Sequence, residues 1–340
     1  MKALVTGGAG FIGSNLVEKL IKNPLISKIV ILDLLNYAGN LSNLRDLDRN
    51  KIKLIIGDVA NGQLMANVIQ EVDVVFHLAA ETHVTRSIYD NYQFFHTDVL
   101  GTQSVANAVL KESSRRSSPI PLIHISTSEV YGTAITEKMS EEHPLNPCSP
   151  YAAAKAGADR LVYSYAQTYD LNAIIIRPFN QYGPKQHPEK AIPRFITNAI
   201  NNEPMPVHGE GNASRDWTHV SDTAEFLSSL ISKDLSSYSG EVFNIGNDSH
   251  ISILEIANMV CQNFNSSSIN MIDERPGQVV RHTCDSSKAR SILGWKPKRE
   301  LKTSLKSVAD WYKNNESIWE PLLLAKDVNI EITPGKYIQH

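Results

Sequence analysis

The sequence has few of the features that mark secreted, membrane or metal-binding proteins. Cysteine occurs at only three positions, Cys148, Cys261 and Cys284, without any paired C-x-x-C spacing. This argues against a disulfide framework and against a zinc site, and it suits the reducing cytoplasm. No apolar run approaches the roughly 18 to 20 residues of a spanning helix, so we expect no membrane segment. At the start of the chain, glycines interrupt the apolar stretch of Met1 to Gly7, which favours a first strand over a signal peptide.

A strong charge of either sign is also missing. The formal net charge is −3 over 340 residues, so the field of the molecule does not favour nucleic acid as a partner. Apolar residues make up 42 % and charged residues 20 %, as in an ordinary folded protein. The length allows one large domain or two smaller ones with an ample core.

Short β-branched runs alternate with longer amphipathic segments through the first half of the chain. Such a rhythm predicts βαβ units on a parallel sheet, here a Rossmann-type doubly wound α/β domain over residues 1–178. The expected strands are residues 3–5, 29–32, 53–56, 72–76, 122–125 and 173–177. Helical spacing covers residues 13–22 and 97–110, and a further helix begins near Tyr151.

The texture changes after residue 178, where proline and glycine interrupt the rhythm. We expect a smaller substrate-binding lobe over residues 179–325, interleaved with the end of the sheet, and a poorly periodic tail over 326–340. Its predicted helices are residues 192–201, 222–232, 253–263 and 301–314, and its predicted strands are 242–245 and 269–272.

The turn after the first strand carries a variant of the dinucleotide-binding fingerprint. Gly7, Gly10 and Gly13 are spaced G-x-x-G-x-x-G, and Asp33 ends the second strand, where a carboxylate can hold ribose hydroxyls. No Arg or Lys follows Asp33 to pair with a 2′-phosphate, so NAD is favoured over NADP. A tight turn without any ligand is the less favoured alternative because of Asp33. The other expected cofactor contacts are Phe11, Ile12, Asp58, Val59, Ala79 and Ala80.

Tyr151 and Lys155 form a Y-x-x-x-K pair at a predicted helix start. Residues four apart share a helix face, so the ammonium lies beside the phenol. A neighbouring Lys and a positively charged nicotinamide favour the phenolate form, which brings Tyr151 into the cofactor site as a base. Thr127 follows a buried strand and can share a substrate hydroxyl proton. On a solvated helix the pair would be an ordinary surface contact.

These motifs together resemble an extended short-chain dehydrogenase/reductase acting on nucleotide-sugars. Five segments are similar to the dTDP-glucose 4,6-dehydratases: residues 33–40, 80–87, 188–193, 215–217 and 275–277. The resemblance implies that Tyr151 takes the sugar 4-OH proton while NAD accepts hydride from C4. Glu129 then removes the acidified C5 proton, water leaves across C5 and C6, and the hydride returns to C6.

The active-site triplet departs from that family. Ser128 stands where the dTDP-glucose enzymes have the Asp that protonates the departing C6 hydroxyl. Serine can only donate a hydrogen bond, so Glu129 is expected both to take the C5 proton and to deliver it. Thr127-Ser128-Glu129 also resembles the triplet of GDP-mannose 4,6-dehydratases, UDP-glucuronate decarboxylases and some UDP-N-acetylglucosamine 4,6-dehydratases.

The resemblance further implies a set of substrate-binding residues and a homodimer built on paired helices. The expected contacts to the nucleotide-sugar are Thr82, Asn180, Lys190, Arg215, Asn244 and Arg281. Ala152, Ala156, Leu161 and Tyr165 suit either a dimer helix face or an ordinary core. The leading interpretation is a cytoplasmic NDP-hexose 4,6-dehydratase acting on dTDP-glucose, UDP-glucose or UDP-N-acetylglucosamine. A UDP-glucuronate decarboxylase, a 4-epimerase and a non-catalytic NAD sensor are the alternatives.

Overall fold

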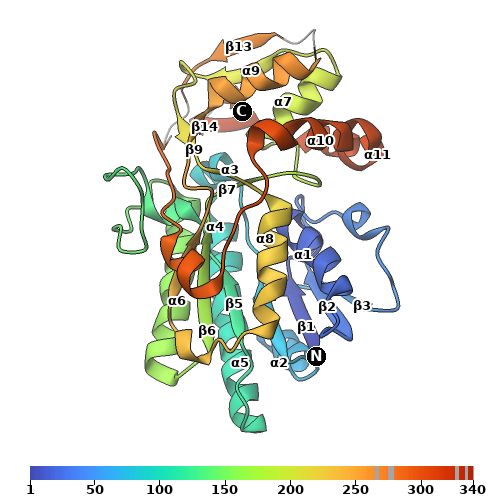
Figure 1. The fold of residues 1–340 in the computed structure, drawn as a ribbon, viewed down its shortest axis with the longest axis vertical. Coiled ribbons are helices and arrows are strands. Elements are labelled where there is room, and N and C mark those ends of the chain that lie inside the picture. Colours follow the sequence, from blue (N-terminus) through green and yellow to red (C-terminus); the bar gives the residue numbers. More distant parts are fainter. Residues whose placement is uncertain (265–267, 275–278, 326–328, 334–335, 340) are drawn as a thin grey trace.

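A seven-stranded parallel sheet forms the centre of the molecule (Figure 1). The computed structural model describes residues 1–264, 268–274, 279–325, 329–333 and 336–339. Across the sheet the strand order is β11-β6-β5-β4-β1-β2-β3. The strands β2 and β3 therefore lie on one side of β1, and the later strands from β4 onward lie on its other side. The strands are β1 Lys2–Thr6, β2 Lys28–Asp33, β3 Ile52–Ile56, β4 Val74–His77, β5 Leu122–Ile125, β6 Ala173–Pro178 and β11 Val242–Ile245. This architecture confirms the predicted doubly wound α/β class, whose ligands bind at the carboxyl ends of the strands.

Helices cover both faces of the sheet because its strands are apolar on both sides. On one face, α1 (Phe11–Lys22) packs against α8 (Val220–Ser229), and their apolar side chains share a core with the sheet. On the other lie α2 (Gly62–Ile69), α5 (Thr102–Arg116) and α6 (Pro150–Tyr169). The chain reaches α5 through α3 (Val84–Tyr89), α4 (Tyr92–Phe94) and the π-helical η2 (Phe95–Gly101).

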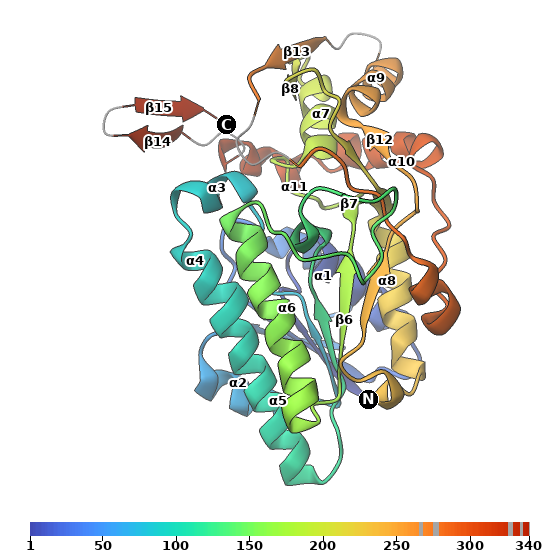
Figure 2. The same ribbon diagram turned by 90° about the vertical axis from the view of Figure 1, so that its left-hand side faces the viewer.

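A smaller lobe stands over the carboxyl ends of the strands (Figure 2). Its separate core is built on α7 (Ala191–Ile200), α9 (Ile253–Phe264) and α10 (Leu301–Asn314). Three separate two-stranded sheets follow the sixth strand in the chain: β7 Asn180–Tyr182 with β10 Trp217–His219, β8 Met205–His208 with β13 Ile269–Ile272, and β9 Ser214–Arg215 with β12 Ile251–Ser252. The shorter helical turns are η1 Leu41–Leu44, η3 Ser128–Tyr131, η4 Leu230–Ser232, η5 Ser236–Tyr238, η6 Ala289–Leu293, α11 Glu316–Trp319 and η7 Glu320–Ala325.

The predicted tail contains regular structure. Its described residues form an antiparallel hairpin of β14 (Asn329–Thr333) and β15 (Lys336–Gln339). The domain boundary at residue 178 remains a prediction. Two elements from beyond that residue, β11 and α8, complete the sheet and core of the predicted domain over residues 1–178. Within the described residues, no helix combines the length and the apolar character needed to cross a membrane.

Candidate active site

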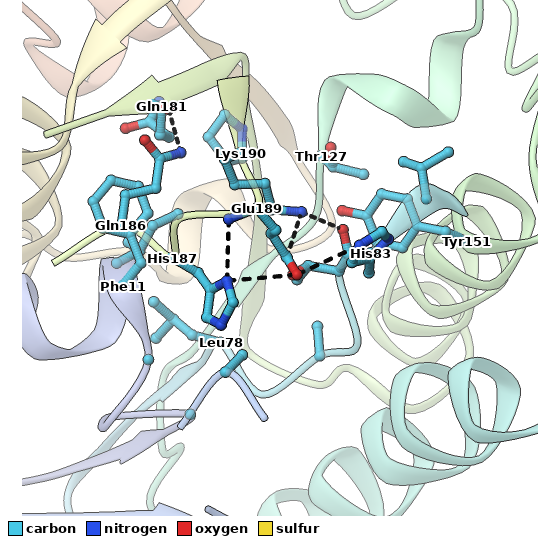
Figure 3. A pocket seen from close by; sticks show the side chains of 18 of the residues that line it. Phe11, Leu78, His83, Thr127, Tyr151, Gln181, Gln186, His187, Glu189 and Lys190 are labelled. Carbon is cyan, nitrogen blue, oxygen red and sulfur yellow. Dashed lines mark hydrogen bonds and ion pairs between the residues drawn. The ribbon is translucent and has the colours of Figure 1, made fainter. Parts of the chain in front are cut away.

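A cavity of about 480 Å³ opens between the carboxyl ends of the strands and the smaller lobe. Its walls contain Gly7, Asp33, Thr127, Tyr151 and Lys190, which come from widely separated parts of the chain. Figure 3 shows Tyr151 and Thr127 on one side and Gln186, His187 and Gln181 on the other. The volume lies in the range of small-molecule and cofactor sites.

The glycine turn after β1 fits a dinucleotide. A side chain at Gly13 would place its Cβ 2.1 Å from the Gly7 carbonyl oxygen, so only glycine permits this turn. Gly7 itself has φ +67 and lies against the backbone of Ala79. Helix α1 begins after Gly10 without a side-chain cap and without an acidic residue in its first turn. Its first N–H groups therefore suit a pyrophosphate.

Asp33 ends β2 at the rim of the same cavity. Its Oδ2 accepts a hydrogen bond from the Ala9 N–H at 2.8 Å, and its Oδ1 accepts one from the Leu35 N–H at 2.9 Å. Burial raises the pKa of this carboxyl, and the two backbone donors oppose that rise. Both oxygens retain a lone pair for ribose hydroxyls. The remaining predicted cofactor contacts all line the cavity: Phe11, Ile12, Asp58, Val59, Ala79 and Ala80.

The turn η3 presents the Thr127-Ser128-Glu129 triplet at the end of β5. Thr127 caps this turn, and its Oγ1 accepts a hydrogen bond from the Glu129 N–H at 3.2 Å. Ser128 is 2 % exposed, whereas the side chain of Glu129 is 20 % exposed. All three residues line the cavity, so a hydroxyl and a carboxylate face any molecule bound there.

Helix α6 holds the Tyr151 and Lys155 pair in place. Ser149 caps the helix by accepting from the Ala152 N–H, and Pro150 occupies its first turn, as both residue types favour. The Tyr151 N–H donates to the Ser87 hydroxyl at 3.1 Å, which joins α6 to α3. Lys155 is buried, and its ammonium donates to the Ile125 carbonyl at 2.8 Å.

The electrostatics of this pair differ from the expectation of a lowered phenol pKa. Burial raises the pKa of Tyr151 well above its usual value, and the carboxylates of Asp98 and Glu129 raise it further, against a hydrogen bond with Thr127. The pKa of Lys155 is lowered by burial, although Asp98 and Asp159 oppose that shift. Tyr151 therefore keeps its proton near neutral pH in this structure.

A charged cluster around Glu189 was not predicted as such from the sequence. The Glu189 carboxylate lies 3.2 Å from the Lys190 ammonium, 3.5 Å from His83 Nε2 and 3.6 Å from His187 Nδ1 (Figure 3). Burial alone would raise the pKa of Glu189, but Lys190, His83 and His187 together hold it below its usual value. The Tyr37 hydroxyl donates to the same carboxylate at 3.4 Å. The only sequence signal was a run of charged and imidazole side chains between prolines.

Four of the six predicted substrate residues line the cavity. Thr82 contributes its carbonyl to the Lys190 ammonium at 2.8 Å. Asn180 has a buried Oδ1 without a hydrogen-bond partner among the described residues. Arg215 is 5 % exposed, and its guanidinium donates to the Ser214 carbonyl at 2.9 Å. The site therefore brings amide and cationic groups together with the Thr127-Ser128-Glu129 triplet.

The other two predicted substrate residues do not line this cavity. Asn244 lies in the interior, where its Oδ1 accepts from the Tyr131 hydroxyl at 2.7 Å and its Nδ2 donates to the Met139 carbonyl at 3.0 Å. Arg281 donates to the carbonyls of Thr136 and Glu137 at 2.6 and 2.8 Å. Their side chains therefore bond neighbouring backbone and side-chain groups, and both predictions remain untested as substrate contacts. The predicted Arg275–Gly277 segment lies outside the described residues.

The fold and these residues define an NAD-type extended short-chain dehydrogenase/reductase. The chain belongs to the family described as GDP-mannose 4,6 dehydratase, whose model matches residues 4–308. It is 37 % identical to a dTDP-glucose 4,6-dehydratase of Streptomyces niveus, over 95 % of this chain and 96 % of that protein. It is 40 % identical to the low-salt glycan biosynthesis protein Agl12 of Haloferax volcanii, over 93 % of this chain and all of that protein.

A solved structure shares the fold almost throughout. The dTDP-glucose 4,6-dehydratase DesIV from Streptomyces venezuelae, crystallised with NAD and TYD, superposes with a TM-score of 0.89 at 35 % identity. The match covers 95 % of this chain and 100 % of that one. The predicted family, fold class, enzyme class of nucleotide-sugar 4,6-dehydratase and NAD cofactor are thereby confirmed.

Proposed function

We propose that this enzyme converts an NDP-hexose, such as dTDP-glucose, UDP-glucose or UDP-N-acetylglucosamine, to its 4-keto-6-deoxy product. The observation that carries the proposal is the meeting of Thr127, Glu129 and Tyr151 in one cavity with the glycine turn. Bound NAD supplies the acceptor for the C4 hydride and a positively charged ring. Gly7, Gly10, Gly13 and Asp33 are the groups that hold it.

The residues of β5 and α6 carry the first proton transfer. Tyr151 takes the proton of the sugar 4-hydroxyl, and Thr127 hydrogen-bonds the same hydroxyl. The positive charge of Lys155 favours the phenolate of Tyr151, and a hydrogen bond to the Ile125 carbonyl holds the ammonium in place. Because burial and two carboxylates oppose the phenolate, the reaction at Tyr151 depends on the positive charge brought by the cofactor.

Glu129 carries the elimination. A ketone at C4 makes the C5 proton acidic, and a carboxylate at the cavity wall is the group suited to remove it. Lys190, Arg215, Asn180 and Thr82 provide donors and a charge for the diphosphate and sugar, since Arg and Lys are the usual partners of phosphate.

Two further features of the proposal concern the whole protein. We propose a cytoplasmic location, supported by Cys148, Cys261 and Cys284, all of which are free thiols. We also propose a homodimer formed through α5, η2 and α6. Leu100, Tyr163 and Tyr169 support it, with 51, 40 and 54 % of their surface exposed. Ala152, Leu161 and Tyr165, by contrast, pack within the chain.

Mass spectrometry tests the proposed reaction. Purified enzyme is incubated, with no added reductant, with dTDP-glucose, UDP-glucose, UDP-N-acetylglucosamine or UDP-glucuronate. The expected result is loss of one water from one of the first three sugars, and loss of that conversion in Glu129→Gln. Exposed Glu142→Gln is the matched control and should retain it. Loss of carbon dioxide from UDP-glucuronate would replace the proposal with a decarboxylase. Full dehydration by Glu129→Gln would remove Glu129 from its role.

A further inference from the structure

The proposed dehydration, on which this inference rests, leaves one proton without an obvious donor. The C6 hydroxyl departs readily only as water, so it must receive a proton while the C6–O bond breaks. Ser128 lines the cavity, but a serine hydroxyl is too weak an acid to give up its proton unless another group replaces it. Ser128 can therefore protonate the departing hydroxyl only if a neighbouring group gives it a replacement proton.

His282 stands directly behind Ser128. Its Nδ1 lies 3.3 Å from Ser128 Oγ and 3.9 Å from Glu129 Oε1, and the side chain has no exposed surface. Its other nitrogen, Nε2, lies 2.8 Å from the Gly132 carbonyl oxygen. A carbonyl can only accept, so Nε2 carries the proton of the neutral ring. The single lone pair of Nδ1 can thus accept from the Ser128 hydroxyl, and Glu129 Oε1, at 3.9 Å, must approach to hydrogen-bond distance before it can pass a proton to Nδ1.

The surroundings of His282 keep the resting ring neutral. Burial lowers its pKa, Glu129 opposes that effect, and Arg215 adds to the lowering. The Gly132 carbonyl raises the pKa, and the Phe179 ring lies edge-on with its centroid 6.1 Å away. A neutral imidazole between a protonated carboxyl and a hydroxyl can accept from one and donate to the other.

We propose that His282 relays the C5 proton from Glu129 through Ser128 to the departing C6 hydroxyl. Glu129 takes the C5 proton, and the electron pair of that bond forms the C5–C6 double bond as the C6–O pair leaves with oxygen. Glu129 passes the proton to His282 Nδ1, and Nδ1 gives it to Ser128 Oγ while the Ser128 proton moves to the hydroxyl. Water departs, and all three residues return to their starting forms. His282 is a positioning residue that acts through Ser128.

A leaving group that needs no proton isolates this role. Fluoride departs as an anion, so we would compare dTDP-glucose with its 6-deoxy-6-fluoro analogue, or UDP-N-acetylglucosamine with its analogue if the wild type prefers that sugar. In His282→Gln the amide can still donate to Gly132, but no titratable nitrogen remains. We expect His282→Gln and Ser128→Ala to lower kcat for the hydroxyl sugar about 100-fold and to dehalogenate the fluoro sugar at close to the wild-type rate.

The remaining variants separate the relay from simple damage. Glu129→Gln should lose both reactions, and His219→Gln, a buried histidine that does not line the cavity, should keep both. Equal slowing of both sugars by His282→Gln would make the residue merely structural, and no slowing of either would leave Glu129 acting alone; both results overturn the relay. A wild-type enzyme that dehydrates neither sugar would overturn the proposed function first, and the relay with it.

Discussion

Asp98 is a buried carboxyl group close to the reactive pair, and the proposed reaction does not use it. Its Oδ1 accepts from the Glu81 N–H at 2.8 Å, and its Oδ2 has no hydrogen-bond partner among the described residues. Burial raises the pKa of Asp98 to about 7, against the positive charge of Lys155 and the Glu81 donor. The folded protein therefore prefers the neutral acid, while the unfolded chain ionises near pH 4.

Asp98→Asn should stabilise the protein at alkaline pH. Because the folded pKa is raised, ionisation costs stability progressively from about pH 4 to pH 7, and the cost is complete above pH 7. Asparagine keeps the acceptor for Glu81 and removes the charge. Urea unfolding should show a gain that is roughly 2–3 kcal/mol larger at pH 8.5 than at pH 5. Exposed Asp46→Asn should show no such difference, and a pH-independent gain would contradict the raised pKa.

Single residues were predictable where short spacing fixes their geometry. Gly7, Gly13 and the Tyr151 and Lys155 pair follow from local periodicity, and each lines the cavity. The interior hydrogen bonds of Asn244 could not be predicted, because its position in β11 does not determine which groups it meets. His282 meets Ser128 across more than 150 positions of sequence, and only the fold brings such residues together.

The turn between β1 and α1 tolerates alanine very unequally at its glycines. A Cβ at Gly13 would collide with the Gly7 carbonyl oxygen at 2.1 Å, whereas one at Gly10 would lie 3.3 Å from the same atom. Gly13→Ala should therefore lower the free energy of unfolding by more than about 2 kcal/mol. It should also abolish NAD binding, because the turn must open to admit the methyl group. Gly10→Ala should cost about 1 kcal/mol or less. Denaturant unfolding and cofactor titration would measure both, and equal losses would contradict this geometry.

Most regular elements were predictable because apolar periodicity is a local property. The sheet strands and the helices around residues 13–22, 192–201 and 301–314 match their expected ranges closely. The expected helix over 97–110 is instead split into π-helical η2 and α5, which shifts the face that each residue presents. The hairpin of β14 and β15 was not predicted, although Ile330 and Ile332 alternate with polar residues in β14, a pattern typical of a strand.

At the scale of the whole molecule, the exposed apolar side chains of η2 and α6 predict self-association. Tyr163 is 40 % exposed beside Arg160, whose guanidinium lies 4.7 Å from the ring centroid, and Leu100 is 51 % exposed. Sedimentation velocity should give a dimer for the wild type and a monomer for the double variant Leu100→Glu, Tyr163→Glu, because two buried charges oppose the contact. Met271→Glu, equally exposed on β13, should remain dimeric. A monomeric wild type would refute the proposed interface.

During synthesis on the ribosome, the six strands β1 to β6 emerge in an uninterrupted block, and β11 joins their edge only much later. The glycine turn, Asp33, Tyr151 and Lys155 all belong to that early block. Helix α8 follows later, so the apolar side of α1 and the sheet that it covers stays open to solvent meanwhile. A growing chain can therefore assemble the predicted NAD-binding part first. Its exposed apolar surface would favour aggregation or chaperone binding until α8 and β11 are synthesised.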